Sequence, residues 1–209
     1  MRRIYAALTF DDGYLKQYEV AEALSKKGIE ATFFLITHLK SYNGEALFTT
    51  KPDLIRKMHR MGHEIASHTT THPLLTEAVQ EIMEAECLAS RNYLSELVGD
   101  EVRGFAYPHG AYNDKVIGVV KKYYSYARIM GRFNRWNTES KDPYTIGGMG
   151  IRHLAELPFN MLKNHNTGYL ILVFHTDSLR TVTNTVRVLN LIGVQFLTLK
   201  QLFEEMSAV

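Results

Sequence analysis

Cysteine is almost missing from this chain of 209 residues, which has a single thiol at Cys87. One cysteine cannot form an internal disulfide, so a disulfide framework is excluded and the redox compartment stays open. Apolar residues recur around this thiol at helical spacing, at Val79, Met83, Leu94 and Val98. This pattern indicates a packed helix face, so we expect Cys87 to be a core residue rather than a nucleophile.

The chain also lacks a large excess of positive or negative charge, and it lacks long apolar runs. The 24 Lys and Arg residues nearly balance the 22 Asp and Glu residues, so we expect no nucleic-acid partner. No segment has roughly 18 consecutive apolar residues, which predicts no membrane span. No apolar stretch after Arg2 and Arg3 is long enough for a signal peptide. The chain as given is therefore expected to be cytoplasmic, or extracellular if a leader was removed.

Linkers, low-complexity tracts and internal repeats are also lacking. The composition, 45% hydrophobic and 22% charged, is that of an ordinary globular protein. We therefore expect one domain over residues 1–209, with a core that needs neither a disulfide nor a structural metal. The sequence predicts no particular oligomeric state.

Three glycines, Gly28, Gly62 and Gly193, each end a helical stretch and precede an apolar run typical of a strand. Strands are expected at 4–10, 29–36, 63–67, 104–107, 125–129, 169–174 and 194–199. Helices are expected at 18–27, 52–61, 76–98, 113–123 and 157–164, and as the stretch that ends at Leu191. The polar, Gly- and Pro-containing segment 131–150 predicts an irregular excursion.

This alternation of strands and helices predicts an α/β fold with a mainly parallel sheet and helices outside it. The simplest fold of this kind is a closed barrel with fewer or less regular strand–helix units than the eightfold (β/α) barrel. Functional sites of such folds lie at the carboxyl ends of the strands.

Polar side chains follow several of the predicted strands. Asp11 and Asp12 come directly after the first predicted strand. Two ionised carboxylates this close repel each other, but a bound cation would relieve the repulsion and let one coordinate it while the other acts as a base. His68 and His72 are four residues apart, a spacing that can hold one metal ion. Each motif alone is also compatible with a polar turn or with surface histidines.

Two further motifs add to these pairs. Tyr107, Pro108 and His109 lead into a glycine turn, where exposed main-chain N–H groups could stabilise an oxyanion. His175 follows the most apolar strand and could exchange a proton near neutral pH. One carboxylate and two imidazoles on a metal leave a position open for water, and the remaining Asp and His supply a base and an acid. Together these residues predict a metal-dependent hydrolase.

The strings Thr-Phe-Asp-Asp-Gly at 9–13 and Ser-His-Thr-x-x-His at 67–72 resemble the polysaccharide deacetylase family, carbohydrate esterase family four. The resemblance extends from about Leu8 to Leu202. It implies a distorted (β/α) barrel with about seven parallel strands and an enzyme that removes N-acetyl groups from an N-acetylated carbohydrate.

Carried over by position, the resemblance implies that Asp11 is the catalytic base and His175 the catalytic acid. Asp12, His68 and His72 would hold the metal, with Zn²⁺ the default and Co²⁺ or Ni²⁺ also suitable. Pro108 matches the family's third motif, and the N–H of the next residue, His109, would face the oxyanion. Tyr107 would join the substrate-binding loop.

The chain departs from the family pattern in three places. Ala106 stands where many members have an arginine that steadies the catalytic aspartate, so Arg103 or Arg128 would have to substitute. The side chain of His109 replaces a frequent aromatic residue and is a loop filler, a substrate contact or an extra ligand. The sequence also has no Asp-Trp motif, whose aspartate orients the catalytic histidine in many members.

Other functions remain compatible with the same residues. An O-acetyl esterase or a hydrolase of a small cyclic amide would use the same groups. A catalytically silent carbohydrate-binding protein or a structural metal protein would keep the fold without the reaction. Tyr42 and Tyr144 lie in polar segments, but no pattern assigns them to a substrate groove.

Overall fold

Parallel strands form the centre of the structure, a computed structural model that describes residues 4–131, 142–156 and 169–207. Seven of the described strands close into a barrel in the order β1-β2-β5-β6-β7-β8-β9, with β9 pairing back to β1. They are β1 (Tyr5–Phe10), β2 (Thr32–Leu35), β5 (Glu64–Ser67), β6 (Gly104–Ala106), β7 (Tyr126–Met130), β8 (Ile146–Gly150) and β9 (Tyr169–Phe174). The predicted distorted barrel of about seven parallel strands is thereby confirmed.

A further short strand, β10 (Gln195–Phe196), pairs with the first half of β1 at Tyr5 and Ala6. The second half of the same edge of β1 pairs with β2 at Thr9 and Phe10.

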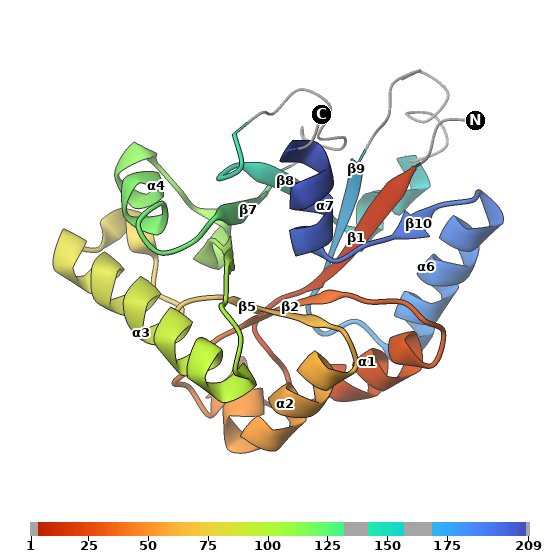
Figure 1. Cartoon of the computed structure of the whole chain (residues 1–209), viewed down its shortest axis with the longest axis horizontal. Helices are drawn as coiled ribbons and strands as arrows, with labels where there is room; N and C mark the ends of the chain where they lie inside the picture. The colour runs from red at the N-terminus through yellow and green to blue at the C-terminus, as the bar shows by residue number, and fades with distance from the viewer. Residues whose placement is uncertain (1–3, 132–141, 157–168, 208–209) are drawn as a thin grey trace.

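Helices surround this barrel (Figure 1). Those on its outside are α1 (Gln17–Ser25), α2 (Pro52–Arg60), α3 (Gln80–Val98), α4 (Asp114–Val120) and α6 (Leu179–Leu191). The last helix, α7 (Leu199–Ser207), packs against β1 and the inner wall. A small antiparallel hairpin, β3 (Ser41–Tyr42) with β4 (Glu45–Ala46), follows β2.

Local sequence signals explain several element ends. Pro52 opens α2, where its missing N–H has no partner to lose. The Asn113 side chain accepts a hydrogen bond from the N–H of Val116 and caps α4. Gly99 ends α3 with a left-handed backbone, φ 74°. The helix expected from residue 76 begins later, because Thr76 lies in a separate 3-10 turn and α3 begins at Gln80.

Three other expectations need correction or fall outside the described residues. Part of the segment expected to be irregular, Ile146–Gly150, is strand β8. Its glycines suggest a loop, yet Gly148 packs so closely that an added Cβ would lie 2.7 Å from Val173 Cγ2. The strand expected at 194–199 is only two residues long, and Leu199 begins the unexpected helix α7. The helix expected at 157–164 lies outside the described residues.

The apolar side chains form an outer and an inner core. The outer one lies between the strands and the surrounding helices and includes Cys87, as expected of a packed helix face. The inner one fills the barrel with alternate strand residues and two leucines of α7; its buried members include Ala7, Phe34, Ala66, Ala106, Ile171, Leu199 and Leu202. Helix α7 therefore completes the interior of the barrel.

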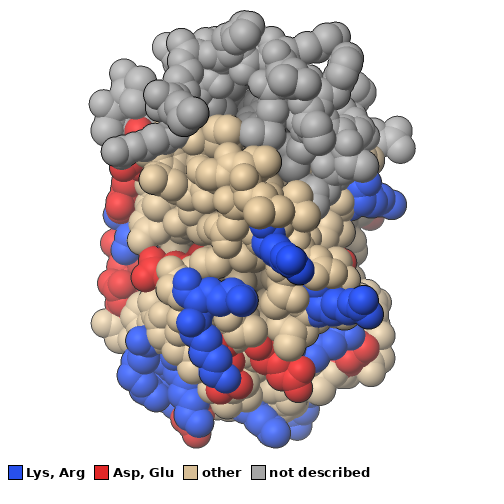
Figure 2. All heavy atoms as spheres, turned by 90° about the vertical axis from the view of Figure 1, so that its right-hand side faces the viewer, with Lys and Arg blue, Asp and Glu red and all other residues tan. Residues whose placement is uncertain are grey.

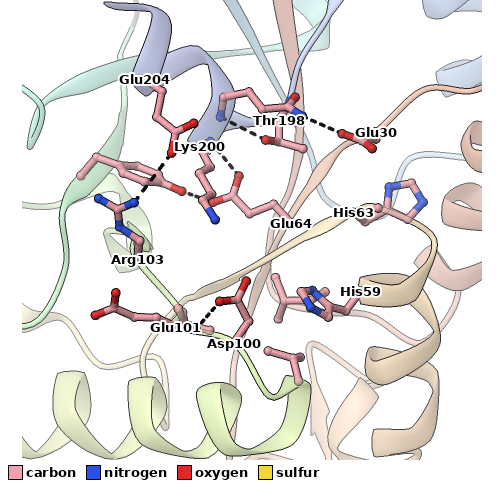
Figure 3. A pocket seen from close by; sticks show the side chains of 16 residues that line it. Glu30, His59, His63, Glu64, Asp100, Glu101, Arg103, Thr198, Lys200 and Glu204 are labelled. Carbon is pink, nitrogen blue, oxygen red and sulfur yellow. Dashed lines mark hydrogen bonds and ion pairs between the residues drawn. The ribbon is translucent and has the colours of Figure 1, made fainter. Parts of the chain in front are cut away.

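The amino end of the barrel carries a polar cavity of about 390 Å³ (Figure 3). The Glu64 carboxylate there accepts hydrogen bonds from the Thr32 hydroxyl (2.7 Å), the Lys200 N–H (2.9 Å) and the Tyr126 hydroxyl. Burial raises the pKa of Glu64 although these donors oppose the shift. These hydrogen bonds link β2, β5, β7 and α7 at this end of the barrel.

Basic and acidic side chains are mixed over the lower half of the face in Figure 2. This agrees with the balanced charge of the sequence. Within 4–131, 142–156 and 169–207, no helix is both long enough and apolar enough to cross a bilayer.

Leu202 tests whether α7 stabilises the barrel from inside. Its side chain is fully buried, so Leu202→Ala should lower the free energy of unfolding by about 2–5 kcal/mol. Leu191→Ala is the matched control, since Leu191 is 80% exposed and should change stability by less than about 0.5 kcal/mol. Denaturant unfolding followed by circular dichroism measures both, and equal effects would contradict the inner-core role of α7.

Candidate metal centre and active site

The alternation of side chains along the strands brings the candidate residues to one mouth of the barrel. Ala7, Ala66 and Ile171 point into the barrel. Because a strand repeats every two residues, Asp11, His68 and His175 continue the same inward faces at the carboxyl ends. The motifs after three strands separated along the chain therefore meet, as the sequence predicts.

Asp12, His68 and His72 form the candidate metal site. One ligand atom of each lies within 4.8 Å of the others, and all three residues are buried. Asp12 Oδ1 is 3.5 Å from His68 Nε2 and 3.6 Å from His72 Nε2. Asp12 and His72 have positive φ angles, 69° and 59°, a strained conformation that is frequent at functional sites.

The protonation states of the two histidines suit a cation. His68 Nδ1 lies 2.8 Å from the Ala106 carbonyl oxygen, so it carries the proton and leaves the Nε2 lone pair free. His72 Nε2 lies 3.1 Å from His68 Nε2. Burial, together with the neighbouring His68 and His109, lowers the pKa of His72 to about 3. Two neutral imidazoles and one carboxylate converging in this way fit a divalent metal of the zinc type.

Asp11 is held beside this group by an arginine. Arg128 Nη2 donates to both carboxylate oxygens of Asp11, at 2.6 Å and 2.5 Å. Burial raises the pKa of Asp11, but Arg128, His68 and His175 together outweigh it and lower the pKa below its usual value. Asp11 is therefore ionised at neutral pH and can accept a proton.

The structure distinguishes between the two candidate arginines. Arg128 is fully buried, lies 5.2 Å from the centre of the Phe34 ring and contacts Asp11. Arg103 lies at the opposite end of the barrel, where it contacts Ser125 and Glu204. Gly148 makes room for Arg128, because a Cβ there would lie 2.9 Å from Arg128 Cδ.

His175 lies at the open side of the site. Its Nε2 is 3.6 Å from Asp11 Oδ2, and its side chain is 46% exposed. It can therefore meet a substrate that arrives from solvent while it stays beside the carboxylate.

The residues of the loop after β6 differ in how close they come to the candidate metal site. His109 is exposed, has φ 59° and places its ring 4.4 Å from the ring of His72. Tyr107, by contrast, is buried in the outer core and donates its hydroxyl to the Tyr144 carbonyl oxygen. Pro108 is buried as well. The structure thus brings His109 to the candidate metal ligands, whereas the Tyr107 side chain packs away from them.

Two tyrosines also lie near the candidate metal ligands. The Tyr42 ring lies 4.8 Å from the His72 ring. Burial and the nearby Asp12 carboxylate raise the pKa of Tyr14. No sequence motif assigns a role to either tyrosine. The turn Asn43-Gly44, where both residues have positive φ, is the signal that could have placed Tyr42 on a hairpin.

Comparison with known proteins agrees with this geometry. The family described as Polysaccharide deacetylase matches residues 1–126, which include all three candidate metal ligands and Asp11. A peptidoglycan-N-acetylglucosamine deacetylase of Bacillus cereus is 26% identical over 203 residues, 94% of this chain and 86% of that protein. A chitooligosaccharide deacetylase of Sinorhizobium fredii is 35% identical over 113 residues, 53% of this chain and 49% of that protein.

A solved structure shares the fold over almost the whole chain. It is the Xyl-CE4 domain of a multidomain xylanase from the hindgut metagenome of Trinervitermes trinervoides, with a TM-score of 0.70 and 21% identity. The match covers 98% of this chain and 92% of that domain. With a family match over more than half of its residues, this chain belongs to the polysaccharide deacetylase family.

Proposed function

We propose that this chain is a metal-dependent hydrolase that removes N-acetyl groups from an N-acetylated sugar, oligosaccharide or polysaccharide. The observation that carries the proposal is the meeting of Asp11 and His175 beside Asp12, His68 and His72 at one mouth of the barrel. The names of the two curated relatives, which act on chitooligosaccharide and peptidoglycan, support the substrate class.

The metal site supports a catalytic rather than a structural role. Among the described residues the ligand group has three members, which leaves a position open for water or substrate. A divalent cation held there, with Zn²⁺ the default and Co²⁺ or Ni²⁺ as alternatives, would polarise the acetyl carbonyl and lower the pKa of the attacking water.

Different side chains carry out the two proton transfers, one from the attacking water and one to the leaving nitrogen. Asp11, kept ionised by Arg128, takes the proton from the water that attacks the carbonyl carbon. The main-chain N–H of His109 faces the developing oxyanion. His175 donates a proton to the leaving nitrogen, which an amide requires because an amine anion is a very poor leaving group.

Three alternatives use the same geometry. An O-acetyl esterase or a cyclic-amide hydrolase differs in its leaving group, and a silent carbohydrate-binding protein lacks the reaction. Release of acetate from a panel of N-acetylated sugars, from monomer to polymer, compared with O-acetylated xylan, separates the deacetylase from the esterase. Ring opening of a small cyclic amide tests the amide hydrolase, and a silent binding protein gives none of these reactions.

Removing one ligand tests the metal site. Asp12→Asn and His72→Ala should each strip bound zinc and lower acetate release more than about 100-fold, because the Lewis acid is lost. Metal analysis and an acetate assay on the folded variants measure this. His59→Ala, at the amino-end cavity, is the control. Full activity of the wild-type protein after chelation would count against the proposal.

Removing the acid tests the proton donor. His175→Ala should lower kcat for an N-acetylated oligosaccharide by about 100-fold or more. An aryl acetate ester, whose leaving group needs no proton, should lose much less. Equal losses on the two substrates would show that His175 does not act as the acid.

Arg128 and Arg103 form a matched pair. Arg128→Lys should lower kcat by about 10-fold or more, because the shorter lysine side chain does not place its ammonium nitrogen where Arg128 Nη2 contacts both oxygens of Asp11. Arg103→Lys, at the other end of the barrel, should leave kcat unchanged. Steady-state kinetics on one N-acetylated substrate decides, and the reverse order would refute the assignment.

A further inference from the structure

Gln17 is a buried polar side chain that the chemistry above does not use. It lies at the start of α1 and is 2% exposed. Its Nε2 donates to the main-chain oxygen of Asp11, at 2.7 Å, and to that of His175, at 2.9 Å. One side-chain nitrogen therefore joins the backbone of the two residues proposed as base and acid.

The break in the strand ladder explains why this link is needed. Strands β1 and β9 pair in register up to Phe10 and Phe174, and the N–H of Asp11 still donates to the Phe174 oxygen at 2.9 Å. At Asp12 the φ angle of 69° turns the chain out of the ladder. The carbonyls of Asp11 and His175 then lie beyond the last rung, and Gln17 supplies two N–H groups to them.

The amide of Gln17 is oriented by these two acceptors. The NH₂ group has two hydrogens, and the two carbonyls use both. A flipped amide would instead place its oxygen against two carbonyl oxygens. Gln17 Oε1 is buried and has no hydrogen-bond partner among the described residues. The Gln17 amide thus leaves its buried oxygen without a hydrogen bond while its NH₂ group binds both site residues.

His175 depends on this link more than Asp11 does. The Asp11 carboxylate is fixed by Arg128 through both oxygens. The side chain of His175 is nearly half exposed, and its main-chain N–H donates to the Asp177 carboxylate at 3.0 Å. The bond from Gln17 ties its main-chain oxygen to the buried interior.

We propose that Gln17 is a positioning residue that holds His175 at a fixed place relative to Asp11, so that acid and base address the same substrate. This inference rests on the proposed function. Loss of the link displaces the proton donor and leaves the metal ligands in place. The defect should therefore be larger for a substrate whose leaving group needs a proton.

Gln17→Met tests this, since methionine fills a similar volume and donates no hydrogen bond. We expect kcat for an N-acetylated oligosaccharide to fall about 10-fold or more, with KM nearly unchanged. For an aryl acetate ester we expect a fall of at most about threefold. Bound zinc should stay at the wild-type level.

Gln201→Met is the matched control. The Gln201 side chain also makes two hydrogen bonds, to Glu30 and from the N–H of Thr198, but at the amino end of the barrel. Gln201→Met should leave the ratio of kcat for the N-acetylated oligosaccharide to kcat for the aryl acetate ester at the wild-type value. If Gln17→Met does not fold, Gln17→Leu, which is also apolar, fills a similar volume and has no donor, carries the same comparison.

The outcomes separate this inference from the proposed function. Equal loss on both substrates, loss of zinc in parallel, or no loss at all would overturn the positioning role of Gln17. A wild-type protein inactive on every N-acetylated sugar would instead overturn the proposed function.

Discussion

Two adjacent carboxylates are buried at the mouth of this barrel, and the rest of the site depends on how their charges are balanced. Asp11 faces the guanidinium of Arg128, which lowers its pKa in spite of burial. Asp12 faces two histidines, and burial lowers the pKa of both of them. Neutral imidazoles leave the charge of Asp12 without compensation, and a bound cation would supply it. One carboxylate is thus suited to hold a metal and the other to take a proton.

This division of roles follows from strand geometry. Asp11 keeps the inward direction of β1, where Arg128 can reach it, and the positive φ at Asp12 turns the next carboxylate towards His68 and His72. Arg128 reaches Asp11 only because β8 has a glycine where its side chain passes. The inner wall combines three alanines, at 7, 66 and 106, with larger side chains such as Phe34 and Tyr126.

Much of the fold and the convergence of the site residues could be predicted from the sequence. Asp11, His68 and His175 each follow an apolar run, and parallel strands bring their carboxyl ends together. The choice between Arg103 and Arg128 could not be predicted, because it depends on which residues of β7 point inward and on the space at Gly148. Helix α7 was missed because Leu197 and Leu199 extend an apolar run, although the run ends as a strand after Phe196. Gln17 carries no signal in the sequence, since a single glutamine near a helix start has no distinctive pattern.

The closing of the barrel by its last segments has a consequence for synthesis on the ribosome. Strand β1 is made first, yet it takes β9 along one edge and β10 along half of the other. Residues Leu199 and Leu202, which fill the interior, emerge later still. A nascent chain that ends before residue 169 therefore exposes an unpaired strand edge and an open apolar wall. Such a chain is prone to aggregation until residues 169–202, which close the barrel and fill its interior, have left the exit tunnel.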